Sequence, residues 1–178
     1  FINKLEQDER KILRNMGVKF GRYHIFLFKL FKPSSVSLRI SLWKNFHQSY
    51  FDLKPPTFGL NFIEEKKSKD KNFMLLCGFE KFGNFYVRID ILERLFMNII
   101  SSNPNKEKEI KLVPEMLNLL GCNKSNFLKL IQLMNYKYFE KENETYFKYV
   151  PKKIKKIKKY LEGQKNNPFD VLNELNFK

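Results

Sequence analysis

The sequence predicts an α+β fold, arranged as two small modules and a charged tail. Stretches with the apolar spacing of a helix alternate with short runs of aromatic and β-branched residues along the chain. An apolar content of 43% and an aromatic content of 16% in 178 residues are sufficient for one core or two small ones. We therefore expect a mixed α+β module over residues 1–102, a second module over 103–150 and a basic tail over 151–178.

The first module should open with a helix over about residues 4–16, and Gly17 is suited to the position that follows a helix. Residues 17–33 then combine β-favouring residues with lysine and arginine, and Pro33 ends the stretch. Gly21 interrupts it, as at a bulge or a close approach of the backbone. Taken alone, the stretch has the character of a buried connector with a cationic rim. Its candidate nucleic-acid contacts are Lys19, Arg22 and Lys29.

A second helix should follow, with Ser34 and Ser35 as possible caps. Its expected buried face consists of Leu38, Leu42, Trp43 and Phe46. Residues 49–72 are expected to be loop, because two adjacent prolines exclude regular structure. Residues 73–77 and 85–89 are expected to be strands joined by a turn.

That turn, GFEKFG at residues 78–83, has the glycine spacing of a phosphate-binding loop. Asn84 and Phe85 stand where such a loop needs Lys and Ser or Thr to hold phosphate and magnesium. We therefore expect no nucleotide site there.

The clearest helix of the sequence begins near Asp90. Asp90 as cap and Glu93 three residues later resemble a capping box, which explains both carboxylates more simply than acid–base catalysis does. The wide apolar face of this helix is expected to consist of Ile91, Leu92, Leu95, Phe96, Ile99 and Ile100.

The second module contains two helices, a short turn and a hairpin. Pro114 suits the start of a helix that Gly121 ends, and Asn123 is suited to cap the next helix. The core face of that helix should consist of Phe127, Leu128, Ile131 and Met134. Runs at 136–140 and 145–150 predict a hairpin. This order is that of a winged helix-turn-helix unit, which can bind nucleic acid through residues such as Lys124 and Lys129 or can serve only for packing.

The tail is the most basic part of the chain. Residues 152–163 place an apolar stripe among six lysines, and such a helix can bind nucleic acid, anionic lipid or an acidic partner, or can remain a solvated tail. The lysines are Lys152, Lys153, Lys155, Lys156, Lys158 and Lys159. Residues 167–175, NPFDVLNEL, form a short apolar patch that suggests docking onto another surface.

Charge and cysteine content narrow the function classes. A net charge of +15 favours a polyanionic partner, although a lysine-rich composition can also reflect an AT-rich genome. Cys77 and Cys122 lack the spacing of metal ligands and are expected to be free thiols in a reducing cytoplasm. No apolar run approaches the ~18 residues of a transmembrane helix. Because the sequence begins with Phe1, we expect a piece of a longer protein or a processed product.

Four segments together carry a resemblance to a known family. They are GVKFGRYHIFLFKLFKP followed by a helix with Trp43, CGFEKFGNFYVRIDILERL, PEMLNLLGCNKSNFLKLIQLMNYKY and the terminal NPFDVLNEL. In this order they resemble the C-terminal region of bacterial superfamily 2 (DEAD/DEAH-like) helicases related to the mitochondrial degradosome RNA helicase. In that family the segments follow the ATPase core.

The resemblance implies a non-catalytic nucleic-acid-binding accessory region of an ATP-dependent helicase, with RNA as the expected substrate. ATP and magnesium would bind to the helicase core of the same polypeptide, because no Walker motif or DExH-like box is recognisable here. One alternative is a freestanding winged-helix regulator that reads duplex DNA through residues 124–135. Another is a structural module that braces the helicase core or recruits a protein. The sequence leaves open RNA or DNA as the partner, and also the oligomeric state.

Overall fold

The computed structural model describes residues 5–47, 52–65, 69–102 and 109–151, which form an α+β fold of helices and small antiparallel sheets. The first elements are α1 (Gln7–Asn15), β1 (Val18–Phe20), β2 (Ile25–Leu27), the 3-10 helix η2 (Phe28–Phe31) and α2 (Pro33–Phe46). The central ones are β3 (Phe62–Glu64), α3 (Lys71–Leu76), β4 (Phe79–Phe82), β5 (Phe85–Arg88) and α4 (Ile89–Ser101). The last are β6 (Ile110–Lys111), α5 (Pro114–Leu120), α6 (Lys124–Leu133), β7 (Tyr136–Lys141) and β8 (Glu144–Tyr149).

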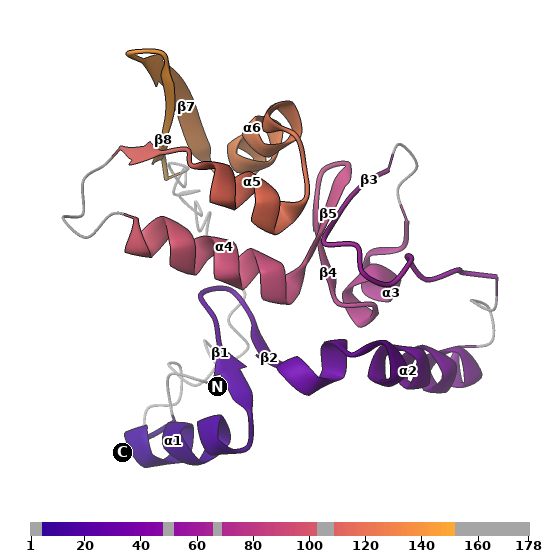
Figure 1. The fold of residues 1–178 in the computed structure, drawn as a ribbon. Coiled ribbons are helices and arrows are strands. Elements are labelled where there is room, and N and C mark those ends of the chain that lie inside the picture. The colour runs from indigo at the N-terminus through magenta and orange to yellow at the C-terminus, as the bar shows by residue number, and fades with distance from the viewer. Residues whose placement is uncertain (1–4, 48–51, 66–68, 103–108, 152–178) are drawn as a thin grey trace, which may run out of the picture.

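Helix α4 occupies the middle of the molecule. In Figure 1, α5, α6 and the β7–β8 hairpin lie on one side of α4, and the β1–β2 hairpin with α1 lies on the other. The sheets are the β1–β2 hairpin, a β3–β5–β4 sheet and a β6–β8–β7 sheet. All of their strand pairs are antiparallel.

Two apolar clusters form the core. The larger joins α4 and β5 to α5, α6 and the β6–β8–β7 sheet, so side chains on both sides of the expected 102/103 boundary pack together. The smaller joins α2 and α3 to β4 and to Tyr86 of β5. Strand β5 serves both clusters because successive side chains point to opposite faces: Phe85 and Val87 belong to the larger and Tyr86 to the smaller.

Several elements follow from the local signals in the sequence. Pro114 is the first residue of α5, and Gly121 closes that helix in the left-handed conformation, with φ 69°. Asn123 caps α6, where its side chain accepts a 2.8 Å hydrogen bond from the backbone N–H of Asn126. The expected hairpin is present as β7 and β8, and β6, which we did not predict, pairs with β8 to complete a three-stranded sheet.

The prediction of a strand at residues 73–77 is wrong. Residues Lys71–Leu76 form helix α3, because Asp70 caps it: the Asp70 side chain accepts a 2.7 Å hydrogen bond from the N–H of Phe73. A short apolar run does not distinguish a helix from a strand by its period, and here the cap decides the outcome. The strand β4 lies instead within the predicted turn, at Phe79–Phe82. The region 49–72, predicted as loop, also contains β3.

The predicted buried face of α2 is wrong except at Trp43, which packs against the smaller cluster. Val36 and Ile40 are buried, whereas Leu38 and Leu42 are each 61% exposed and Phe46 is 83% exposed. The helix is apolar on two sides, so its sequence does not determine which side packs. Contact with α3 decides it, through the half-buried Trp43, whose ring centroid lies 5.7 Å from that of Phe73. The helix begins at Pro33 with Lys32 as its cap, so neither Ser34 nor Ser35 is the cap residue.

The capping role predicted for Asp90 and Glu93 is wrong as well. Helix α4 begins at Ile89 with Arg88 as its cap, and Arg88 pairs with Asp90 through two contacts of 2.6 and 3.0 Å. Glu93 contacts a distant hairpin instead. The predicted apolar face of α4 is confirmed except at Ile100, which is 49% exposed.

Candidate nucleic-acid interface

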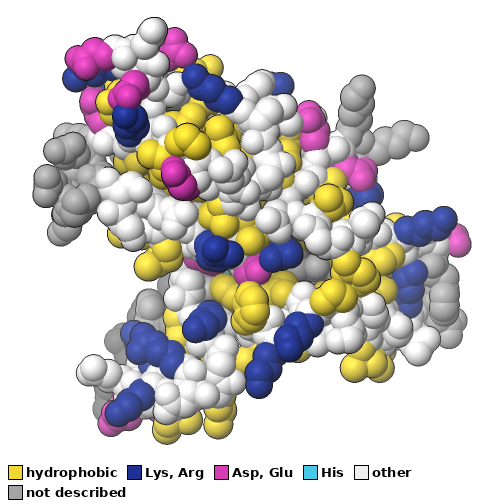
Figure 2. Space-filling view, in the orientation of Figure 1, with side chains coloured by type: hydrophobic (Ala, Val, Ile, Leu, Met, Phe, Trp, Pro, Cys, Tyr) yellow, Lys and Arg dark blue, Asp and Glu magenta, His cyan; other side chains and the backbone are white. Residues whose placement is uncertain are grey.

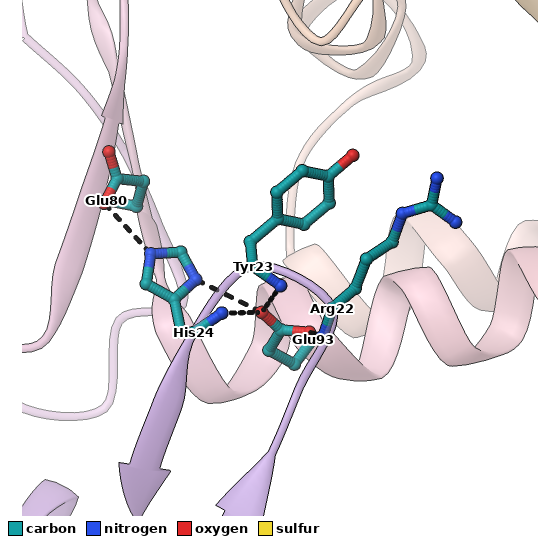
Figure 3. A network of polar contacts seen from close by, with 5 residues as sticks. All are labelled: Arg22, Tyr23, His24, Glu80 and Glu93. Atoms are coloured by element: carbon teal, nitrogen blue, oxygen red, sulfur yellow. Dashed lines mark hydrogen bonds and ion pairs between the residues drawn. The ribbon is translucent and has the colours of Figure 1, made fainter. Parts of the chain in front are cut away.

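Glu93 of α4 holds the loop of the β1–β2 hairpin. The carboxylate is buried and accepts hydrogen bonds from three successive backbone N–H groups, those of Arg22 at 2.6 Å, Tyr23 at 3.0 Å and His24 at 2.9 Å (Figure 3). Hydrogen bonds to a charged acceptor are stronger than neutral ones. The loop between β1 and β2 is therefore fixed on α4.

The His24 ring extends this contact to the β3–β5–β4 sheet. Its Nδ1 lies 3.2 Å from Glu93 Oε1 and its Nε2 lies 3.1 Å from Oε2 of Glu80 on β4 (Figure 3). The Tyr23 ring packs on Phe96 of α4, with 4.5 Å between ring centroids. The hairpin is thus attached to α4 and β4 by polar contacts and one aromatic pair.

A cleft of about 510 Å³ lies between the anchored hairpin and α4, and we call it the hairpin cleft. Four cationic side chains line it: Arg14, Lys19, Arg22 and Arg94. Four phenylalanines line it too: Phe20, Phe26, Phe28 and Phe96. Figure 2 shows Lys and Arg side chains over α1, the β1–β2 hairpin and α4 on one face of the molecule. The hairpin cleft therefore combines positive charge with exposed apolar surface.

Positive charge exceeds negative charge in the hairpin cleft, because four cations and two carboxylates, Asp90 and Glu93, line it. Asp90 is bound by Arg88, and Glu93 by the backbone N–H groups of the loop. Within the described ranges, none of the four cations of the cleft forms a salt bridge with an acidic side chain. Arg14 lies over the Phe20 ring at 5.5 Å, and Arg22 over the Tyr23 ring at 5.6 Å. The lining of the cleft therefore carries an excess of positive charge, which favours an anionic ligand.

The predicted contact residues fall into separate places. Lys19 and Arg22 lie together in the hairpin cleft, and Lys29 is exposed on η2, next to Phe28 of the cleft. The Nζ of Lys124 lies 3.8 Å from Oε1 of Glu140. Lys129 lines a different hollow, next to α6. The six tail lysines lie outside the described residues.

Sequence reasoning missed Arg14 and Arg94 in this cleft. Arg14 is in the last turn of α1, where a cation is also expected for the helix dipole. Arg94 follows Glu93 on α4 and faces solvent there. Their spacing in the sequence carries no signal for a shared site, because the fold of the hairpin onto α4 brings them together.

The surface of α6 is approached by the neighbouring sheet. Asn126 donates from Nδ2 to Glu64 of β3 at 2.9 Å, and Leu133 lies close to Gly83 in the β4–β5 turn. The hollow at Lys129 and Gln132 is lined on its other side by Glu64, Gly83 and Asn84. Part of the α6 surface therefore packs against β3 and the β4–β5 turn.

In the described part of the chain, no three His, Cys, Asp or Glu side chains come together as a metal site. None of the helices described there has the length and apolar character needed to cross a membrane.

A scan of family models, a search of curated proteins and a search of solved structures each return no match for this chain.

Proposed function

We propose that this chain is a non-catalytic nucleic-acid-binding accessory region of an ATP-dependent helicase that acts on RNA. The observation that carries the binding proposal is the hairpin cleft, where four cations gather and both carboxylates are already bonded. The link to a helicase rests on the resemblance of four ordered segments. In this proposal, ATP and magnesium bind to the helicase core of the same polypeptide, and this region holds the nucleic acid.

We also propose that the second module is a winged-helix-like unit. The order α4, β6, α5, α6, β7, β8 and the β6–β8–β7 sheet support it. The contacts of α6 with β3 and the β4–β5 turn favour a packing role for this module over that of a freestanding duplex reader.

The binding proposal is tested by titrating a fluorescently labelled RNA with the whole chain over a range of salt concentrations. The affinity should fall with salt, with a log–log slope of about −0.7 per phosphate contact on a single strand. The triple variant Lys19→Gln, Arg22→Gln, Arg94→Gln should flatten this slope by roughly two units. The matched control is Lys54→Gln, Lys71→Gln, Lys137→Gln, which removes the same charge from exposed positions outside the hairpin cleft. Equal slopes in the two variants, or no binding at all, would refute the proposal.

A second function, docking onto the helicase core or another protein, is favoured by α2. Leu38, Leu42 and Phe46 recur at every fourth position and are all more than half exposed. Such a contiguous apolar stripe on a helix whose other side is already packed is typical of an interaction surface. If the upstream reading frame encodes a helicase core, calorimetric titration of that core with this chain should show binding. The substitution of all three residues by Ser should abolish the heat, whereas binding that survives would place the contact elsewhere.

A further inference from the structure

We propose that the hairpin cleft binds a single strand of nucleic acid, with bases against its phenylalanine rings and phosphates against its arginine and lysine side chains. This inference rests on the proposed function and specifies which form of nucleic acid is bound and where. Each part of it follows from the size, the lining and the charges of the cleft.

The size of the hairpin cleft suits one or two nucleotides. Its volume of about 510 Å³ lies in the range of pockets that hold small molecules, about 300–1,000 Å³. The paired bases of a duplex, enclosed by two backbones, are too large to lie within a space of this size. The cleft could therefore hold the bases of unpaired nucleotides only.

The rings of the hairpin cleft offer stacking surfaces that only unpaired bases can use. Phe28 is 54% exposed, and Phe20 and Phe26 are half-buried, so their rings remain accessible from the cleft. Phe96 also lines the cleft, but its side chain is buried and packs against the Tyr23 ring. Base–aromatic stacking tolerates any sequence because every base has a flat π-face. In a duplex these faces are covered by neighbouring base pairs.

The cations lie where a backbone would run beside such bases. Lys19 and Arg22 come from the hairpin and Arg94 from α4, so cations from both elements line the cleft. The guanidinium carbon of Arg14 lies 5.5 Å from the centre of the Phe20 ring, so a cation and a ring lie together in the cleft. Aromatic rings beside cations are the combination that proteins use to hold single strands.

The test measures the preference for single strands and its dependence on one ring. Labelled oligonucleotides of about 12 nucleotides, a length that single-strand sites cover, are prepared as single-stranded RNA, single-stranded DNA and RNA duplex. Their affinities for the whole chain are measured by fluorescence anisotropy. Phe28→Leu removes a ring but keeps an apolar side chain, and Phe46→Leu is its matched control, since Phe46 is also exposed but lies on α2 away from the cleft.

We expect the natural chain to bind the single strands more tightly than the duplex. Phe28→Leu should weaken single-strand binding by roughly 5- to 150-fold, the loss expected for one stacked base. It should leave duplex binding unchanged, and Phe46→Leu should change neither. The RNA and DNA single strands show whether the 2′-hydroxyl contributes.

Failure of this inference is distinguishable from failure of the proposed function. If the chain binds nucleic acid in a salt-dependent manner, but Phe28→Leu and Phe46→Leu behave alike or the duplex binds as well as the single strand, the inference is wrong and the proposed function stands. If no oligonucleotide binds, both are wrong. A far-ultraviolet circular dichroism spectrum equal to that of the natural chain shows that a variant is folded.

Discussion

Glu93 and Gly21 lie closer together than any side chain at residue 21 would permit. A Cβ placed on Gly21 would lie 2.3 Å from the Cδ of Glu93. Because the glycine leaves this space open, the Glu93 carboxylate reaches the three backbone N–H groups that follow it. The close approach of the backbone predicted at Gly21 is therefore confirmed, and its cause is a side chain on a distant helix.

Replacement of Gly21 by alanine should loosen the hairpin from α4. The added methyl group collides with a buried carboxylate, so we expect Gly21→Ala to lower the free energy of unfolding by about 1–3 kcal/mol in urea denaturation. A double-mutant cycle with Glu93→Ala gives the control, since the clash no longer exists in that background. An undiminished cost in the Glu93→Ala background would show that the strain at Gly21 has another source.

Truncation of Leu95 should be among the most damaging changes to the core. Leu95 lies on α4 and is fully buried within the larger cluster, so Leu95→Ala should cost about 2–5 kcal/mol of unfolding free energy. Leu38→Ala makes the same chemical change on the exposed stripe of α2 and should cost less than about 0.5 kcal/mol. Similar thermal midpoints for the two variants would contradict the core assignment.

The two thiols should make stability depend on alkaline pH. Burial raises the pKa of the Cys77 thiol to about 11 and that of the Cys122 thiol to about 11, from 9.0. Folding therefore favours the neutral thiols, and the stability that they contribute is present below pH 9.0 and lost as the pH rises towards about 11. The urea midpoint should fall less across this window in the variant Cys77→Ala, Cys122→Ala. If the urea midpoints of the natural chain and of the variant fall in parallel with pH, the thiols do not contribute this pH dependence.

The chain alone should not turn over ATP. The GFEKFG segment that imitates a phosphate-binding loop is occupied by strand β4 and its turn to β5, with Phe82 paired to Phe85. We expect no phosphate release from ATP above background, with or without RNA. A turnover that disappears on substitution of Gly83 would overturn this prediction.

The tail should add a sequence-independent electrostatic contribution to binding. Lys155, Lys156, Lys158 and Lys159 lie outside the described residues, so this prediction rests on the sequence alone. Each phosphate contact on a single strand contributes about −0.7 to the slope of log affinity against log salt concentration. Replacement of these lysines by Gln should therefore flatten that slope by several units. All sequences should weaken alike, because phosphate contacts do not specify bases. An unchanged slope would mean that the tail does not contact nucleic acid and is either a solvated segment or a protein-docking segment.

The sequence predicts the second half of the chain better than the first, for a physical reason. In the second half, Pro114, Gly121 and Asn123 act on their own neighbours, so helix ends are determined locally. In the first half, the outcome depends on distant partners. The contact of α2 with α3 decides which of its two apolar sides is buried, and α4 supplies the anchor of the hairpin loop.

The candidate site shows the same division. Lys19 and Arg22 are recognisable from the density of cations among aromatic residues in one stretch of sequence. Arg14 and Arg94 belong to other elements and join them only after the hairpin folds onto α4. The prediction for Glu93 is wrong because a capping box is the simplest explanation for a carboxylate at that position of a helix. The true partner, the β1–β2 loop, lies about 70 residues earlier in the sequence, so no neighbouring residue indicates it.

The alternation of side chains along β5 should make unfolding of the molecule cooperative. Since Phe85 and Val87 belong to one cluster and Tyr86 to the other, neither cluster can release this strand while the other remains intact. Heating should therefore melt both halves in one cooperative transition, with equal calorimetric and van't Hoff enthalpies. A protease should find no stable intermediate fragment that ends between α4 and β6. Division of the chain between α4 and β6 would separate α4 from the side chains of α5 and α6 that cover it. Neither piece should therefore fold alone.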